Sequence, residues 1–532
     1  MDNIINPAGQ VRSVSHRGSR WARLWVSVLA AGVAAGAVRA QTSYSISTLA
    51  GAAAGLNAPA AVVADGAGNL YVADRGNHVI RKVVVSTGVV TTIAGLAVTP
   101  EKTDGAGAAA RFNSPYGLAL DVAGNKLYVS DTSNHTIRVI DLAPATPVVS
   151  TFAGSAGAAG STNGDRLTAA KFNLPYGLAL TGGSLYVADL GNQGIRRIVI
   201  ATGAVSTLAG PDGSVGNPVG LQSFVDSSTP ASARFSNPTS LATDGTSLFV
   251  ADRDNHRIRR VVLATGVVST LAGPFDTPVT PSGATDGIGT LARFRQPEGI
   301  AIDSAGTTLF VAEALSHTLR RIVISTQDVT TMAGSAGVSG TADGLATAAR
   351  FNRPLAIASD LSANLFVVDE GNNAIRRGSI ATVPAITSAN NATFALGGLG
   401  SFTFTATGSP TPTYSVSVGT LPPGLSLSSA GVLSGVPSTA VGSPFSFTVQ
   451  ASNGVAPAAT QVFTLTVNQP PVFTSAASTT FVVGNAATYQ VVATGSPAPT
   501  FSITAGSLPP TVASLSSAGL ITAAPPSTRA GY

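Results

Sequence analysis

Apolar and polar residues alternate along much of the chain in short runs of β-strand length. Between residues 60 and 94, four such runs lie at 60–64, 70–74, 79–85 and 89–94, separated by Gly, Asn and Asp. Runs of four to eight residues bounded by turn residues predict strands rather than helices. Four strands joined by short turns predict one small antiparallel sheet. The pattern therefore indicates an all-β chain.

The same four-run pattern recurs six times. In each copy an apolar run follows a proline, and the next run leads into a polar string that is similar in all six copies, as in LYVADRGNHVIRK from Leu70 and LFVADRDNHRIRR from Leu248. The prolines lie 56 to 63 residues apart, and self-similarity at a fixed period is typical of repeat architectures. They are Pro59, Pro115, Pro175, Pro238, Pro297 and Pro354.

These strings resemble the NHL repeat, a β-propeller family in which four-stranded sheets, the blades, surround a central channel. The resemblance covers residues 45 to roughly 380 and implies a six-bladed propeller at residues 41–382. In the first five copies the last predicted strand ends in Ala-Gly, and the sixth copy lacks this strand. A segment of the same type, SISTLAG at Ser45–Gly51, precedes the first copy and belongs to none of them. We therefore expect the N-terminal strand to close the ring, which leaves no long free sheet edge.

The composition changes abruptly after Pro384. Between this residue and Tyr532 the chain holds no Asp, Glu, Lys or His. Sandwich modules that bind calcium do so through carboxylate and carbonyl oxygens. Stiffening of the junctions by calcium-bound carboxylates is therefore excluded here, and we expect the prolines of Gln469–Pro471 to restrict the linker instead.

A second, longer repeat occupies this region. TGSPTPTYS at Thr407 matches TGSPAPTFS at Thr494, an offset of 87 residues, and strands such as SFTFTAT alternate apolar and polar residues. Both features predict Ig-like β-sandwiches. The string LPPGLSLSSAGVLSGVPS from Leu421 also resembles Ig-like domains that bacterial surface proteins carry in series. We expect one module at 383–469 and a second, incomplete module at 470–532.

Most of the formal net charge of +5 comes from the first forty residues. They hold five arginines and one Asp, an almost wholly apolar stretch from Leu24 to Val38, and small residues before Gln41. This pattern predicts a signal peptide at residues 1–40. The rest of the chain has 25 basic and 24 acidic residues, so no nucleic-acid partner is indicated. We expect a secreted, cell-surface or periplasmic protein without a membrane span once the signal is removed.

No catalytic or metal-binding motif stands out in the repeats. Four of the five histidines occupy one equivalent position, as do the strand-end carboxylates that begin with Asp74. Side chains spread around a ring do not converge on one metal ion, so we assign the carboxylates to turn capping and to hydrogen bonds with adjacent loops. We therefore predict no catalytic residue, no metal and no cofactor. A propeller lyase or lactonase is the enzymatic alternative.

The connections between repeats predict the face on which a ligand binds. One is short and five are long, and insertions on one face of a propeller often mark the binding face. The basic residues of the long connections form either a ring for an anionic ligand or, as we favour, pairs with the loop residues Asp104, Asp165, Asp226, Asp286 and Asp343. These basic residues are Arg111, Lys171, Arg234, Arg293 and Arg350.

The residue after each repeat proline should lie at the rim of the channel. Aromatic and polar side chains there can stack on and hydrogen-bond to a sugar or a peptide; the alternative is that the tyrosines pack under the long loops. The predicted ligand-binding residues are Tyr116, Tyr176, Thr239 and Glu298.

Together these features predict an exported, non-enzymatic binding module carried on Ig-like spacers. Its expected partner is an extracellular glycan, peptide or protein, bound on the inserted-loop face of the propeller. A passive cell-surface display or stalk protein is the alternative.

Overall fold

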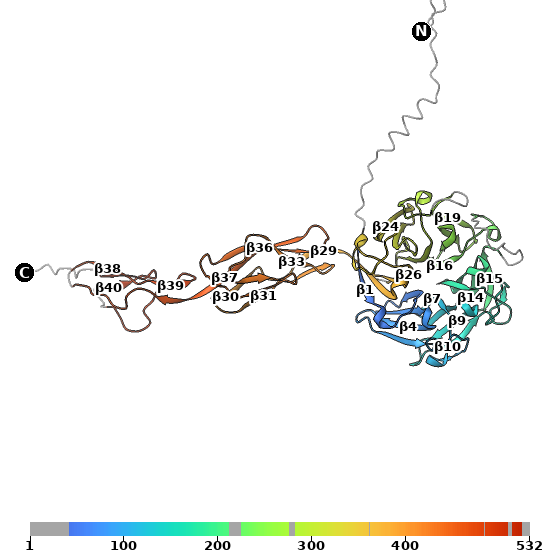
Figure 1. Ribbon diagram of the computed structural model, residues 1–532, viewed down its shortest axis with the longest axis horizontal. Coiled ribbons are helices and arrows are strands. Elements are labelled where there is room, and N and C mark those ends of the chain that lie inside the picture. The colour runs from blue at the N-terminus through green and yellow to red at the C-terminus, as the bar shows by residue number, and fades with distance from the viewer. Residues whose placement is uncertain are drawn as a thin grey trace, which may run out of the picture. The chain divides into compact units, whose positions relative to one another are not determined.

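The computed structural model describes residues 42–211, 225–275, 282–360, 362–482, 485–508 and 513–523. Within these ranges the protein is all-β, as predicted, and its helical segments are 3-10 turns of three residues. Six antiparallel sheets surround a common axis (Figure 1). The predicted signal peptide at 1–40 lies outside the described residues. In the part of the chain that is described, no helix is long and apolar enough to cross a membrane.

Each blade begins at the channel with its first strand and proceeds outward. The first blade contains β2 (Ala61–Ala64), β3 (Asn69–Asp74), β4 (Val79–Val84) and β5 (Val90–Ala94). The second contains β7 (Pro115–Asp121), β8 (Lys126–Asp131), β9 (Thr136–Asp141), β10 (Val148–Ala153) and β6 (Gly105–Ala106). The third contains β12 (Pro175–Thr181), β13 (Ser184–Asp189), β14 (Gly194–Val199), β15 (Ala204–Ala209) and β11 (Gly164–Asp165).

The other three blades repeat this order. The fourth contains β16 (Pro238–Thr243), β17 (Ser247–Asp252), β18 (Arg257–Val262) and β19 (Val268–Ala272). The fifth contains β21 (Pro297–Ile302), β22 (Thr308–Glu313), β23 (Thr318–Val323), β24 (Asp328–Gly334) and β20 (Gly287–Ile288). The sixth contains β26 (Pro354–Ser359), β27 (Leu365–Asp369), β28 (Ala374–Ile380), β1 (Tyr44–Ala50) and β25 (Gly344–Leu345).

The N-terminal strand belongs to the sheet of the last three propeller strands. β1 pairs antiparallel with β28, where Ile46 lies opposite Gly378. Tyr44 and Ile46 are buried among residues of the fifth and sixth blades, and the ring of Tyr44 meets that of Phe310 edge to face, with 6.2 Å between centroids. The first strands of neighbouring blades lie side by side, including β26 beside β2. The two ends of the propeller segment are thereby joined.

Glycine near the start of the inner strands allows the blades to approach closely. A Cβ atom on Gly117 would lie 2.0 Å from the carbonyl oxygen of Tyr176, and one on Gly177 would lie 2.5 Å from that of Thr239. Only a residue without a side chain fits at such distances. These glycines therefore allow the second blade to approach the third, and the third to approach the fourth.

Four of the long connections lie partly along the outer edges of the blades. β6, β11, β20 and β25 each add a two-residue fifth strand outside a blade. The added strands cover edges that would otherwise be unpaired.

The 3-10 turns are η1 (Ala52–Ala54), η2 (Arg75–Asn77), η3 (Gly107–Ala109), η4 (Thr132–Asn134), η5 (Leu190–Asn192), η6 (Pro230–Ser232), η7 (Arg253–Asn255), η8 (Gly289–Leu291), η9 (Ala346–Ala348) and η10 (Glu370–Asn372).

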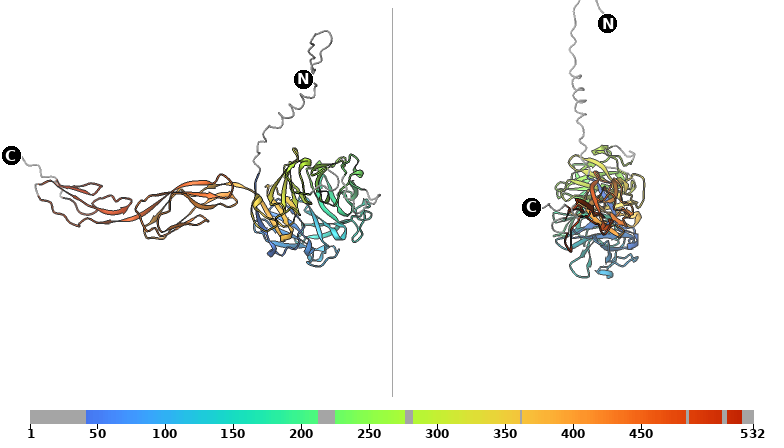
Figure 2. Two further views of the ribbon diagram at one scale, coloured as in Figure 1. Left: turned by 45° about the horizontal axis from the view of Figure 1, so that its top comes forward. Right: turned by 90° about the vertical axis from the view of Figure 1, so that its left-hand side faces the viewer.

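The chain after the propeller is also all-β (orange to red in Figure 2), and it begins with a module whose two main sheets enclose one core. In the first module, β30, β37, β36 and β33 form one sheet in that order and β31, β35 and β34 another, around a core that includes Phe404, Phe447 and Phe463. Its strands are β29 (Thr382–Ile386), β30 (Asn391–Ala395), β31 (Gly400–Thr403), β32 (Ala406–Ser409), β33 (Thr413–Val418), β34 (Leu425–Leu427), β35 (Val432–Gly435), β36 (Phe445–Ser452) and β37 (Ala459–Phe473). Beyond it lie β38 (Ala487–Gln490), β39 (Ala493–Ser496), β40 (Ala513–Leu515) and β41 (Leu520–Ala523).

Candidate ligand-binding site at the channel mouth

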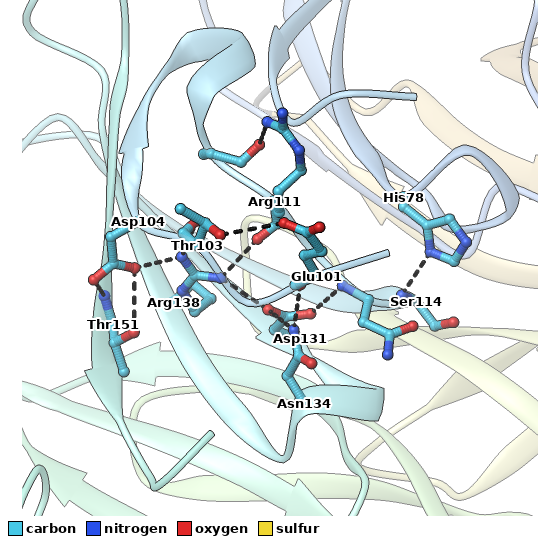
Figure 3. Close-up of polar contacts among 12 residues, drawn as sticks. His78, Glu101, Thr103, Asp104, Arg111, Ser114, Asp131, Asn134, Arg138 and Thr151 are labelled. Carbon is cyan, nitrogen blue, oxygen red and sulfur yellow. Dashed lines mark hydrogen bonds and ion pairs between the residues drawn. The ribbon is translucent and has the colours of Figure 1, made fainter. Parts of the chain in front are cut away.

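A buried arginine on the third strand organises the loops of the second to sixth blades, as Figure 3 shows for the second blade. The side chain of Arg138 is 1% exposed, and its Nη1 lies 2.9 Å from Oδ2 of Asp131. Asp131 also accepts hydrogen bonds from the backbone N–H of Asn113 and from Nδ2 of Asn134. The guanidinium lies 5.3 Å from the ring centroid of Phe112. The strand-end carboxylate therefore holds the adjacent loop, as the sequence predicts.

The loop aspartates pair with these buried arginines and not with the loop arginines. Asp104 contacts Nη2 of Arg138, whereas Arg111 donates to the carbonyl oxygens of Ala108 and Ala110. The predicted pairing of Asp104 with Arg111 is therefore wrong. A buried guanidinium loses more than an accessible one when its N–H groups lack acceptors, so the buried arginine takes the carboxylate.

Three of the other four long connections follow the same rule. Asp226 pairs with Arg259, Asp286 with Arg320 and Asp343 with Arg376. Asp165 accepts hydrogen bonds from Leu167 and Thr168, so its predicted pairing with Lys171 is also wrong. The remaining loop arginines, Arg234, Arg293 and Arg350, donate to carbonyl oxygens of their own 3-10 turns.

One side chain at an equivalent position of every repeat, a histidine in four of the six, links each blade to the next. Nδ1 of His78 accepts a hydrogen bond of 3.0 Å from the backbone N–H of Ser114, which precedes the next repeat proline (Figure 3). Ser114 has a φ of 54°, and the residues before the other five repeat prolines are also left-handed. Equivalent acceptors serve all six boundaries: His135, Gln193, His256, His317 and, between the sixth and first blades, Asn373. The histidines thus have a structural role.

The innermost strands of all six blades line a cavity of about 280 Å³ in the channel. Most of its lining side chains are small, such as Ala61 and Ala242, or aliphatic, such as Leu118 and Ile300, but polar atoms form more of its accessible wall than apolar atoms do. Glu298 is the one charged residue among those that line it. The cavity therefore offers polar atoms as well as apolar side chains to a small molecule.

Glu298 has one carboxylate oxygen with a partner and one without. Its Oε1 lies 3.6 Å from Nη1 of Arg253, whereas within the described structure its Oε2 is buried and has no hydrogen-bond partner. Burial raises the pKa of Glu298 to about 7, against the opposing effect of Arg253. A buried acceptor without a partner is costly, so this oxygen is suited to a donor from a ligand.

The two predicted tyrosines stack on each other. The rings of Tyr116 and Tyr176 lie 4.0 Å apart between centroids, at 29° between their planes, and the guanidinium of Arg75 lies 5.9 Å from the Tyr116 ring. Tyr116 is buried, with 7% of its surface exposed, while Tyr176 is half-buried. Burial raises the pKa of both phenols, so both are neutral at physiological pH. Tyr176 is the more accessible of the pair.

Thr239, the third predicted residue, also lines the cavity, and its hydroxyl already has a partner. It is completely buried, and its hydroxyl donates a hydrogen bond of 2.8 Å to the carbonyl oxygen of Glu298. This contact links the fourth blade to the fifth. Thr239 therefore holds the backbone of Glu298 in place and does not present a free hydroxyl.

Sequence reasoning missed a second set of residues at this end of the channel. Arg75, Arg253 and Glu370 each follow a strand-end Asp and open η2, η7 and η10, respectively. Arg75 pairs with Glu370 at 2.9 Å, and Arg253 contacts both Asp254 and Glu298. The signal in the sequence is that this position carries Arg or Glu in three repeats and an uncharged residue in the other three.

The comparisons with known proteins agree with the repeat architecture. Residues 50–262 match the family model described as "Teneurin NHL domain", and residues 382–468 match the one described as "Putative Ig domain". The chain therefore contains an NHL-repeat propeller followed by an Ig-like domain.

Two curated relatives match part of the chain. The chloroplastic protein SUPPRESSOR OF QUENCHING 1 of Arabidopsis thaliana is 30% identical over 282 residues, which are 51% of this chain and 26% of that protein. NHL repeat-containing protein 2 of Bos taurus is 29% identical over 339 residues, which are 59% of this chain and 45% of that protein. The chain thus matches less than half the length of these relatives.

Among solved structures, an auxiliary nutrient binding protein from Bacteroides ovatus is similar with a TM-score of 0.46 and 17% sequence identity. The similarity covers 64% of this chain and 77% of that one. A likeness of this degree says nothing about ligands.

Proposed function

We propose that this protein is an exported binding protein whose propeller captures a small polar ligand, or a polar segment of a larger one, at the channel mouth. We define the channel mouth by Tyr116, Tyr176, Glu298, Arg75 and Arg253. The observation that carries the proposal is the unpartnered Oε2 of Glu298, a buried oxygen of a residue that lines the channel cavity. A ligand hydroxyl or amide N–H would supply the missing donor.

The remaining groups define the rest of the ligand. Tyr176 is half-exposed and stacks on Tyr116, so its accessible surface offers an aromatic contact to a sugar ring or a peptide side chain. The arginines near it are already paired with carboxylates, Arg75 with Glu370 and Arg253 with Asp254 and Glu298. Because these charges are compensated, an uncharged polar ligand fits better than an anion.

The proposed cellular role follows from the flanking segments. Residues 1–40 have the composition of a signal peptide, so we place the protein outside the cytoplasm. The Ig-like modules would then act as spacers that carry the propeller. A glycan, a peptide or a segment of another extracellular protein remains the proposed partner.

Glycan and peptide arrays probed with the full chain test this proposal. We expect retention on a limited set of uncharged polar ligands, and a reduced signal for Glu298→Gln on the same ligands. The matched control is Glu101→Gln, which removes an exposed carboxylate from a connection, away from the cavity lining. Absence of any retained ligand, or equal signals for parent and Glu298→Gln, would contradict the proposal.

A further inference from the structure

The third blade departs from the charge pattern of the four other blades whose third-strand arginine is fully buried. Four of the buried third-strand arginines contact two carboxylates, one at a strand end and one in a long connection. In the third blade Arg196 contacts one carboxylate, that of Asp189, at 2.8 Å. The loop position is held by Asn163, whose Oδ1 accepts a 2.8 Å hydrogen bond from Nη2 of Arg196.

Asn163 is followed by Gly164. In an Asn-Gly pair no side chain hinders attack of the glycine nitrogen on the asparagine Cγ, and asparagine is for such reasons a thermolabile residue. Both residues are exposed, and Gly164 begins the two-residue strand β11 at the outer edge of its blade. Water therefore reaches the site, and a short edge strand can rearrange at low cost.

We propose that Asn163 is a site of spontaneous deamidation, and that its product completes the two-carboxylate arrangement that four other blades show. The backbone nitrogen of Gly164 bonds to Cγ of Asn163, loses its proton, and displaces the side-chain nitrogen as ammonia. Water then opens the cyclic imide at the new N–Cγ bond, which restores the backbone and leaves an aspartate. The net change is one amide and one water converted to one carboxylate and one ammonium ion.

Arg196 favours both steps. Its guanidinium contacts Oδ1, the atom on which negative charge develops during the attack, and a fixed cation there lowers the barrier. The same guanidinium then binds the carboxylate by a charge-assisted hydrogen bond. Asp104 with Arg138 and Asp286 with Arg320 show the arrangement that the product would adopt.

The chain contains a matched control at its second Asn-Gly pair, Asn453-Gly454. Nδ2 of Asn453 donates to the carbonyl oxygens of Thr382 and Pro410, both at 2.9 Å. The leaving nitrogen is therefore held in place, and a carboxylate formed here would face two carbonyl oxygens. The same dipeptide should react more slowly.

Peptide mass spectrometry of the full chain, incubated in mildly alkaline buffer, tests the proposal. We expect Asn163 to convert on the order of tenfold faster than Asn453 in the folded protein, mainly to aspartate, and the two sites to react at similar rates in denaturant. Equal rates in the folded protein, or isoaspartate as the main product at 163, would overturn the proposal.

Two variants give an independent readout. Asn163→Asp should melt at or above the temperature of the parent, because Arg196 gains a second carboxylate. Asn453→Asp should melt below it. A lower melting temperature for Asn163→Asp would show that the third blade does not accommodate the aspartate, and would also overturn the proposal.

Discussion

Nδ1 of His78 accepts a hydrogen bond from the backbone N–H of Ser114 across the boundary between the first two blades. Because the backbone nitrogen is the donor, the imidazole must be neutral at Nδ1. Three further histidines make the same contact, while Gln193 and Asn373 make it with side chains that do not titrate. The boundaries between blades therefore differ in their response to acid.

This difference predicts how stability depends on pH. Burial lowers the pKa of His78, His135, His256 and His317 below the usual value. The neutral form is favoured by folding, so its contribution is complete above about pH 6.5 and is lost as the pH falls toward the folded pKa values. We expect the free energy of unfolding to decrease over this range.

Denaturant titrations at several pH values check this prediction. Replacing all four histidines by Gln, the residue that the third blade already uses, should remove much of the decrease between about pH 6.5 and 5. An unchanged pH dependence in that variant would show that protonation of these histidines does not weaken the ring.

The buried arginine should matter far more than the loop arginine next to it. Arg138→Ala leaves Asp131 buried without its cation, which should cost about 3 to 5 kcal/mol in the free energy of unfolding. Arg111→Ala removes hydrogen bonds to two carbonyl oxygens and should cost about 1 kcal/mol. Chemical denaturation of both variants measures the difference, and similar losses would refute the assigned roles.

The N-terminal strand should stabilise the propeller through its buried face. Ile46 is 1% exposed on β1, whereas the next residue, Ser47, is exposed. Ile46→Asp should therefore destabilise the protein by about 3 kcal/mol or more, and Ser47→Asp by less than about 0.5 kcal/mol. If both variants melted like the parent, β1 would not be an integral strand of the sixth blade.

The sequence predicts the fold class better than it predicts polar contacts. The all-β class and the NHL-type repeat follow from strand-length runs and from strings such as that at Leu70, which recur often enough to be read without a structure. The partner of Asp104 does not follow, because Arg138 is 34 residues away, while Arg111 is near in sequence. Proximity along the chain favours the wrong partner when a buried group competes.

The channel mouth shows the same limit. The positions after the repeat prolines identify Tyr116 and Glu298, since every inner strand begins in the same way. They do not reveal that Thr239 turns its hydroxyl to the neighbouring backbone, or that Arg253 reaches Glu298 from another blade. Both depend on how adjacent blades are packed, which no periodicity encodes.

The ionisation of Glu298 should control ligand binding. Burial raises its pKa to about 7, so the carboxylate that accepts a ligand donor forms only as the pH rises through this value. Affinity for an uncharged donor ligand should therefore increase between about pH 6 and 8. Titration calorimetry across this range with parent and Glu298→Gln checks it, because the variant should show a flat profile. A flat profile for the parent would exclude Glu298 from the contact.

The most direct test of the account is the affinity of the channel mouth for a ligand selected on the arrays. Titration calorimetry should show that replacing Tyr116 and Tyr176 together by Ala weakens binding by about 1 to 3 kcal/mol, since both rings belong to the proposed site. Lys82→Ala, on the third strand of the first blade, should change it by less than about 0.5 kcal/mol. Equal effects of the two changes, in variants that melt like the parent, would place the site elsewhere.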